Sequence, residues 1–224
     1  MRRLLRANSL TLVFLGLFLL ALFFQAIAGH AAFNDEQVGH SEPTVSFWNY
    51  VTSSTFAVAV MENWQSEYLQ FTLFIVLTVW LVQKGSPESK ELDAAGSESD
   101  QRQRVGGHAD RDSPQWARVG DLRRRIYENS LLLAMGTIWI ASWLAQSIAG
   151  VSEFNAEQLA HHQPKISWAD YLVNPSFWER TLENWQSEFL AVGSMAIFAV
   201  YLRQRGSPES KPVGAPHSAT GIEG

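Results

Sequence analysis

The residues of this chain best placed to do chemistry belong to a string that occurs twice. ENWQSE stands at 62–67 and again at 183–188, each time directly before an apolar segment. Its last glutamate should lie level with a glutamine about one helical turn before the end of the preceding apolar segment. A glutamine amide donates to a carboxylate, and polar groups away from water need such partners. We therefore predict two clusters: Gln25 with Glu67, and Gln146 with Glu188.

These clusters have two interpretations. A carboxylate inside a membrane is a functional candidate, which could carry protons or cations. The alternative is a structural hydrogen bond that locks two helices together, and it is favoured because the clusters would lie at the membrane edge rather than at its midplane.

Helical periodicity assigns the residues of the string to different faces. On a helix over 56–82, an aromatic stripe with i, i+4 spacing includes Glu67, whereas Glu62, Gln65 and Ser66 point away from it. We expect Glu67 and Glu188 to pack against aromatic rings, and Glu62 and Glu183 to be solvated. The stripe is Phe56, Val60, Trp64 and Tyr68 in the first copy, and Phe177, Thr181, Trp185 and Phe189 in the second. The repeated residues Asn63, Trp64, Gln65, Asn184, Trp185 and Gln186 are interpreted as structural motif positions.

Other chemical motifs are weak or absent. Glu36 with His40, and Glu157 with His161, have i, i+4 spacing that could offer metal ligands, but ordinary polar loop residues are the better interpretation. No phosphate loop, dinucleotide fingerprint or nucleophile elbow is present, so we expect no metal, no cofactor and no catalytic residues. The absence of cysteine excludes disulfides and thiolate chemistry, and the net charge of −5 excludes a generally basic nucleic-acid binder.

Long apolar segments must position these residues. Segments 9–29 and 130–150 carry no charge over 21 residues, enough to cross about 30 Å of hydrocarbon. Segments 68–82 and 189–202 are shorter and span only if their helices include the preceding NWQSE. A cleaved signal peptide is the alternative for the first segment, but its ending Gln-x-Ile-Ala-Gly recurs at 146–150, where no signal peptidase acts.

Basic residues predict the orientation. Of 17 Lys and Arg, all but Lys165 and Arg180 lie in the two tails and the central segment, which should therefore be cytoplasmic. The segments near 30–60 and 151–182 should lie outside. They contain Ser46 and Ser167, which are expected to cap short helices at the outer interface, and Asn174-Pro175, expected before the last helix.

An internal duplication organises the chain. The halves align without a gap at an offset of 121 residues, and each holds an even number of spans, so both repeats should have the same orientation. We predict an all-α membrane protein with four transmembrane helices, built as two tandem hairpins of parallel orientation. The expected parts are the first repeat 1–90, a disordered cytoplasmic linker 91–120, the second repeat 121–211 and a disordered tail 212–224. The basic run 123–125 is either a topology signal or a contact with anionic lipid.

A second string, GSPESK, ends each hairpin at 85–90 and 206–211. Gly85 and Gly206 fit positions just past a helix, and Pro87 and Pro208 fit the first turn of a new one, preceded by serine as N-cap. The interpretation is a helix stop and restart at the cytoplasmic interface. A docking or phosphate-contact site remains the alternative, because capping alone does not demand the whole string.

The sequence resembles an uncharacterised family of small bacterial multi-pass membrane proteins, which is catalogued as a domain of unknown function. The resemblance lies in two strings: NWQSE followed by Tyr or Phe before a span, and RGSPESKP or KGSPESKE after it. The resemblance covers both hairpins and implies a bacterial inner-membrane protein with both termini cytoplasmic, without an activity. The leading functional hypothesis is a non-enzymatic structural, envelope or partner-binding role, with the lipid bilayer and further copies of the chain as partners. The alternatives are a small ion or solute pathway lined by the Gln and Glu pairs, and a membrane-embedded enzyme using outer Glu and His residues.

Overall fold

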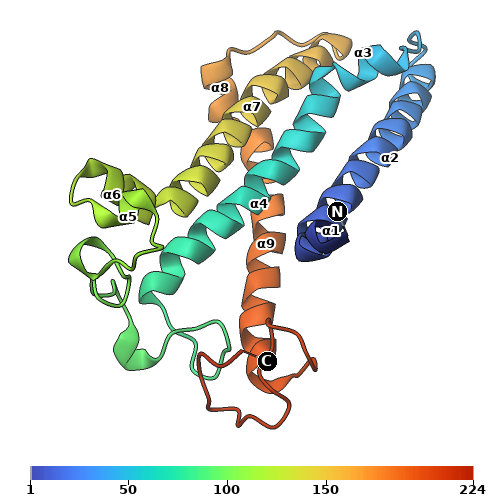
Figure 1. Cartoon of the computed structure of the whole chain (residues 1–224). Helices are drawn as coiled ribbons and strands as arrows, with labels where there is room; N and C mark the ends of the chain where they lie inside the picture. Colours follow the sequence, from blue (N-terminus) through green and yellow to red (C-terminus); the bar gives the residue numbers. More distant parts are fainter. Residues whose placement is uncertain (1, 224) are drawn as a thin grey trace. The chain divides into compact units, whose positions relative to one another are not determined.

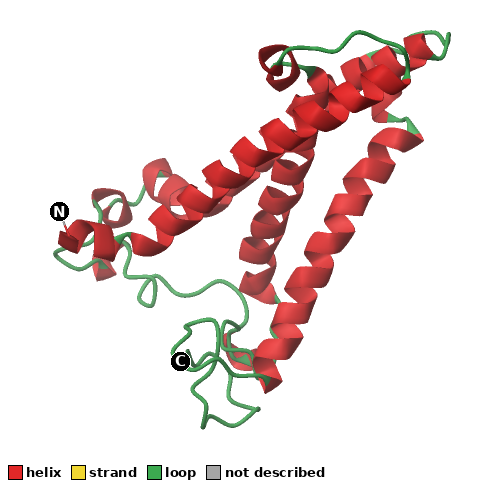
Figure 2. Cartoon of the chain, turned by 90° about the vertical axis from the view of Figure 1, so that its right-hand side faces the viewer, coloured by secondary structure: helices red, strands yellow, loops and turns green. Residues whose placement is uncertain are grey.

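The computed structural model describes residues 2–223, and these form helices, turns and loops without a strand (Figure 2). The prediction of an all-α protein is therefore confirmed for this part of the chain. The chain divides into two compact units, and the long helices α4 and α7 each contribute to both. Unit 1 comprises 1–60 and 145–171, and unit 2 comprises 61–144 and 172–224.

Two 31-residue helices are long and apolar enough to cross a membrane by length and composition. They are α2 (Ser9–Gly39) and α7 (Ser130–Ala160). Helix α2 lies near the N-terminus, where a signal sequence would have the same properties. Both helices continue ten residues beyond the apolar segments, because no proline or glycine pair interrupts the polar sequence that follows.

In unit 1, one asparagine in each repeat fixes the chain as it returns from the end of the long helix. Asn34 accepts from Val45 N–H at 2.8 Å and donates to Val45 C=O at 3.0 Å. Asn155 makes the same two bonds with Ile166, at 2.8 and 2.9 Å. Each side chain thus satisfies both backbone groups of one residue, as a neighbouring strand would.

Short helices follow these asparagines: α3 (Phe47–Val51) and α8 (Trp168–Leu172). The predicted caps are confirmed, because Ser46 accepts from Asn49 N–H at 3.3 Å and Ser167 from Asp170 N–H at 3.2 Å. Each helix buries a tyrosine against a glycine of the long helix: Tyr50 against Gly29, and Tyr171 against Gly150. Burial, with a smaller effect of the Glu153 charge, raises the pKa of Tyr50.

Unit 2 is built around α9 (Pro175–Tyr201) and most of α4 (Ser54–Trp80). The predicted turn before the last helix is confirmed as a cap, since Asn174 accepts from Ser176 N–H at 2.9 Å and Pro175 takes the first helical position. Figure 1 shows α4 and α9 running in the same direction toward the two GSPESK strings. The linker adds short helical turns, η1 (Leu92–Ala94), η2 (Gly106–His108) and α5 (Gln115–Arg118), before α6 (Leu122–Glu128).

The predicted helix restart at GSPESK is wrong. After α4 and α9 end, both strings form non-helical turns in which Gly85 and Gly206 have φ of 88° and 80°, values that favour glycine. The second serine of each string does not cap a new helix but accepts a hydrogen bond from a backbone N–H six residues earlier. Ser89 accepts from Gln83 N–H at 2.8 Å, and Ser210 accepts from Gln204 N–H at 2.9 Å. The proline therefore lies inside a turn rather than starting a helix.

The lysine of each string closes the loop that follows. Lys90 donates to Gly96 C=O at 3.0 Å. Lys211 is buried and donates to the carbonyls of Pro216, His217 and Ala219 at 3.3, 2.9 and 3.1 Å. The tail thus folds back on the second string. Disorder of the linker and of the tail stays a prediction.

Candidate functional site

The two ENWQSE strings meet in unit 2, where α4 packs against α9. Three of the side-chain pairs between described residues of the two helices define this contact, which we call the seam. Glu62 and Arg180 form an ion pair at 3.1 Å, and Trp185 Nε1 donates to Gln65 Oε1 at 2.7 Å. Ser66 Oγ lies 3.4 Å from Glu188 Oε1. The seam therefore pairs charge with charge and donor with acceptor within about one turn of α4.

Aromatic rings enclose the seam on the α7 side. Trp143 packs against Trp185 and Phe177 with ring centroids 6.0 and 6.1 Å apart, and it stacks on Trp139 at 6.2 Å. Within the described residues, the buried nitrogens Gln65 Nε2, Trp139 Nε1 and Trp143 Nε1 have no hydrogen-bond partner. The surroundings of the seam are thus largely apolar, which strengthens the polar pairs that it contains.

The predicted inward face is right for three of the four stripe residues of the second copy and wrong in the first copy. In α9 the stripe residues Phe177 and Thr181 are buried and Trp185 is half-buried, whereas Phe189, the last residue of the predicted stripe, is exposed. In α4 the opposite face is buried, so Gln65 and Ser66 are almost fully enclosed and Glu62 is ion-paired rather than solvated. On this buried face, Glu62 accepts from Arg180 and Gln65 accepts from Trp185. Glu183 is exposed, as predicted.

The four residues of the predicted Gln–Glu clusters lie in different environments. Gln25 and Glu67 are exposed. Gln146 is buried, and its Oε1 has no partner among residues 2–223, whereas Glu188 is half-buried in the seam. Gln25 and Gln146 belong to unit 1 and the two glutamates to unit 2. The pairing of Gln25 with Glu67 and of Gln146 with Glu188 stays a prediction.

The remaining residues of GSPESK point to one further feature. Glu88 and Glu209 are the corresponding acids of the two strings, and their side chains form a hydrogen bond. This bond raises the pKa of Glu88 to about 7, with smaller effects from partial burial and from the charges of Glu209 and Glu223. Gly221 N–H donates to Ser86 C=O at 3.0 Å, and Thr220 Oγ1 accepts from Gly85 N–H at 2.9 Å. The tail therefore contacts the first string as well as the second.

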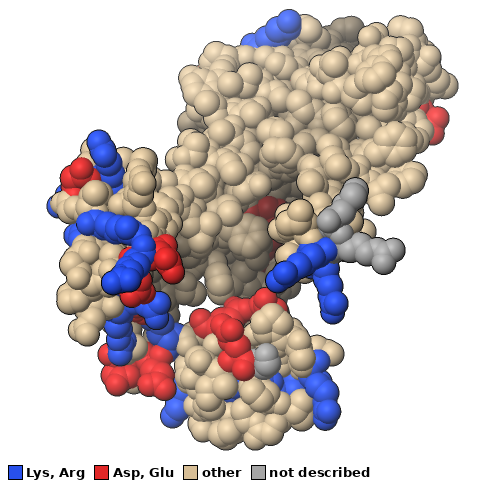
Figure 3. Space-filling model, viewed as in Figure 1, with Lys and Arg blue, Asp and Glu red and all other residues tan. Residues whose placement is uncertain are grey.

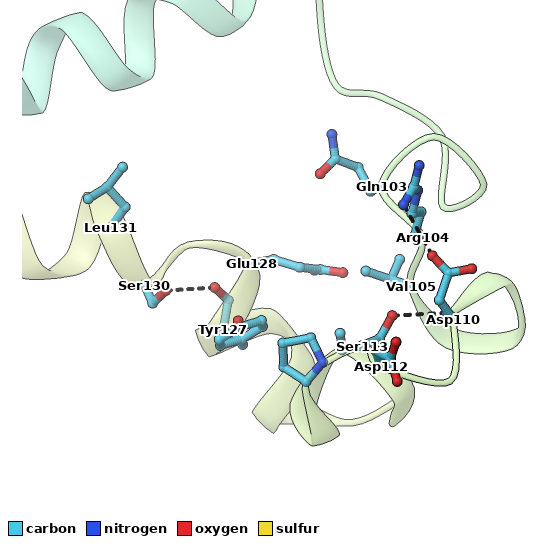
Figure 4. Close-up of a pocket in the computed structure, with 12 residues that line it drawn as sticks. Gln103, Arg104, Val105, Asp110, Asp112, Ser113, Tyr127, Glu128, Ser130 and Leu131 are labelled. Atoms are coloured by element: carbon cyan, nitrogen blue, oxygen red, sulfur yellow. Dashed lines mark hydrogen bonds and ion pairs between the residues drawn. The ribbon is translucent and has the colours of Figure 1, made fainter. Parts of the chain in front are cut away.

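Charged side chains also gather outside the seam. On the face drawn in Figure 3, they cover the linker and the turns at the ends of α4 and α9. Figure 4 shows an open pocket in the linker region, with Arg104, Asp110, Glu128 and Tyr127 among the residues around it. Arg104 and Asp110 are paired at 3.2 Å. In the described part of the chain, no group of three or more His, Cys, Asp or Glu could hold a metal ion.

Arg180 is the seam residue that sequence reasoning missed. It stands three residues before ENWQSE and is one of only two basic residues in the predicted outer segments. Its position could have indicated an ion pair, because a single arginine in a segment with few other basic residues favours an acidic partner on a neighbouring helix.

A family model matches almost the whole chain. The model of the family described as "Domain of unknown function (DUF6766)" matches residues 1–222. No curated protein and no solved structure matches the chain.

Proposed function

Since the chain belongs to this family of unknown function, we propose a function from its own residues: a small multi-pass membrane protein with a non-enzymatic structural or partner-binding role. The observation that carries the proposal is the seam. Its polar side chains contact one another across the two helices, in the pairs Glu62–Arg180, Gln65–Trp185 and Ser66–Glu188. Polar groups used in this way hold helices together.

The proposed architecture is four transmembrane helices in two hairpins of the same orientation. Helices α4 and α9 each have 27 residues, about 40 Å of helix, which exceeds the hydrocarbon thickness. The basic residues favour cytoplasmic termini and a cytoplasmic linker, as in a bacterial inner membrane. Contacts of α4 and α9 at nearly the repeat offset, 118 to 122 residues, support repeats that run in parallel.

Single-cysteine labelling tests this topology, because the natural chain has no cysteine. Thr44→Cys in the proposed outer loop should react with a membrane-impermeant maleimide on intact cells, whereas Ser97→Cys in the linker should react only after permeabilisation. Both side chains are exposed. The reverse pattern, or equal labelling, would contradict the proposed orientation.

A small ion pathway is the second candidate, favoured by one observation. Gln146 is buried with an unpartnered Oε1 in the described chain, and a buried acceptor of this kind can coordinate a cation or water. A Glu67→Gln/Glu188→Gln variant in liposomes distinguishes the candidates. The structural role predicts reduced thermal stability and no cation flux in either protein. A flux in the wild type that the variant abolishes would instead support the pathway.

A further inference from the structure

Helix α6 carries three consecutive arginines, and the structure gives them different surroundings. Arg124 forms ion pairs with Asp100 at 3.3 Å and with Glu128 at 3.2 Å. Arg125 is exposed and has no ion pair among residues 2–223. The side chain of Arg123 is 68% exposed, and the carboxylate that caps the helix lies 4.0 Å from it. One arginine of the run is therefore used within the protein, while the other two face solvent.

The exposed side of α6 combines apolar and basic side chains. Leu122 and Ile126 lie one turn apart and are 69% and 41% exposed. At about 100° per residue they form one stripe, with Arg125 about 80° to one side of its centre and Arg123 about 80° to the other. Arg124, which is paired within the protein, lies opposite this stripe. An apolar stripe flanked by arginines is typical of a helix that lies in a membrane interface.

The joint between α6 and α7 keeps this helix next to a candidate span, and Figure 1 shows α6 at the beginning of α7. Asn129 ends α6, and its side chain donates to Arg125 C=O at 2.8 Å. Ser130 begins α7 and donates to Tyr127 C=O at 2.8 Å (Figure 4). The apolar residues of α7 start at Leu131, so less than one helical turn separates them from α6.

The same joint stands between α1 (Arg2–Ala7) and α2 in the first repeat. Asn8 donates to Leu4 C=O at 2.9 Å, and Ser9 donates to Arg6 C=O at 3.0 Å. The joint therefore recurs at the start of both candidate spans, although the short helices before it differ in sequence. This recurrence supports a fixed place for the short helix beside the span.

We propose that Leu122, Arg123, Arg125 and Ile126, which we call the α6 face, bind the headgroups of anionic phospholipid at the cytoplasmic surface. The proposal rests on the proposed function, which places α7 across the bilayer. The two apolar side chains enter the boundary of the hydrocarbon, and the two guanidinium groups donate to phosphate oxygens. Anionic lipid fits this face because no carboxylate among the described residues comes closer than 4.0 Å to either guanidinium.

Lipid-specific quenching tests the proposal on the full-length protein in nanodiscs. A fluorophore is attached to Gly120→Cys, directly before α6, in a chain that otherwise lacks cysteine and at a position where an added Cβ meets open space. The nanodiscs contain phosphatidylglycerol and phosphatidylcholine in equal amounts, and one of the two lipids carries a nitroxide on its acyl chain. We expect stronger quenching by phosphatidylglycerol, with association favoured by about fivefold for each of the two arginines. The preference should weaken as salt is added, because salt screens exposed charges.

Two charge-neutralising variants of the labelled protein locate the effect. Arg123→Gln/Arg125→Gln should abolish the preference for phosphatidylglycerol, because it removes both charges of the α6 face. The matched control Arg102→Gln/Arg111→Gln removes the same charge from exposed residues of the linker and should keep the preference.

Each result decides the proposal. Equal quenching by the two lipids, or a preference that survives Arg123→Gln/Arg125→Gln, overturns it. Loss of the preference in the control overturns it too, because the charge of the whole linker then attracts the lipid. Absence of quenching by both lipids means that protein rather than lipid covers the α6 face, which also overturns it. The maleimide labelling described above tests orientation separately, since both leaflets of the nanodisc hold the same lipids.

Discussion

The ion pair between Glu62 and Arg180 offers a sharp test, because the chain carries its own control. Glu183 occupies the same place in an identical ENWQSE string but is exposed. We expect Glu62→Gln to destabilise the protein and Glu183→Gln to leave its stability almost unchanged. The reason is that Glu62 is paired with Arg180, whereas Glu183 has no ion pair among residues 2–223.

The magnitude follows from distance and exposure. At 3.1 Å the Coulomb attraction is about 5 kcal/mol for an effective dielectric constant near 20. The side chains are 19% and 38% exposed, so solvent screening and the cost of desolvation offset much of it. We expect a net loss of about 1–2 kcal/mol for Glu62→Gln, against less than about 0.5 kcal/mol for Glu183→Gln.

Reversible unfolding in detergent micelles measures the difference, with both variants followed by circular dichroism under the same conditions. The charge-swapped variant Glu62→Arg/Arg180→Glu should recover part of the loss, because it restores opposite charges across the seam. Equal stability of Glu62→Gln and Glu183→Gln would refute the assignment of a paired role to Glu62.

Two further predictions concern regions outside the seam. Gly150→Ala should lower the free energy of unfolding by about 1–3 kcal/mol in thermal unfolding, because the added methyl group would collide with the Tyr171 hydroxyl. The control Gly193→Ala should be neutral or stabilising, because the space around Gly193 is open. Equal effects of the two variants would contradict this packing. A raised pKa means that the folded protein binds the Glu88 proton more tightly, so stability should fall as pH rises from about 4.5 to about 7. The change should be small, because the Glu88 side chain is only partly buried and solvent reaches much of it. Glu88→Gln should remove that dependence on pH, and an unchanged profile would argue against the Glu209 hydrogen bond.

Several local structures were predictable because they depend on neighbouring residues. Ser46 caps its helix as expected, since capping needs only a side chain and the next turn, and the turn expected at Asn174-Pro175 precedes the last helix. The turn after α4 was not predictable in full. Its form depends on Ser89 reaching back to Gln83 N–H, and Ser-Pro alone fits a helix start equally well.

The faces of the two repeats show where sequence reasoning ends. Periodicity identifies which residues share a side of a helix, but α4 and α9 carry the same string and bury opposite sides of it. The choice depends on what each helix meets: Gln65 meets Trp185, and Gln186 is exposed. A property of a pair of helices cannot be read from either helix alone.

The asparagine that fixes each returning loop has a consequence for the ageing of the protein. Its amide donates to one backbone carbonyl and accepts from the amide of the same residue. Spontaneous deamidation of Asn34 would leave a carboxylate, which only accepts, facing the Val45 oxygen. Repulsion would then replace one of the two bonds, and the loop carrying α3 would loosen, although the chain would keep its length and its mass would rise only slightly.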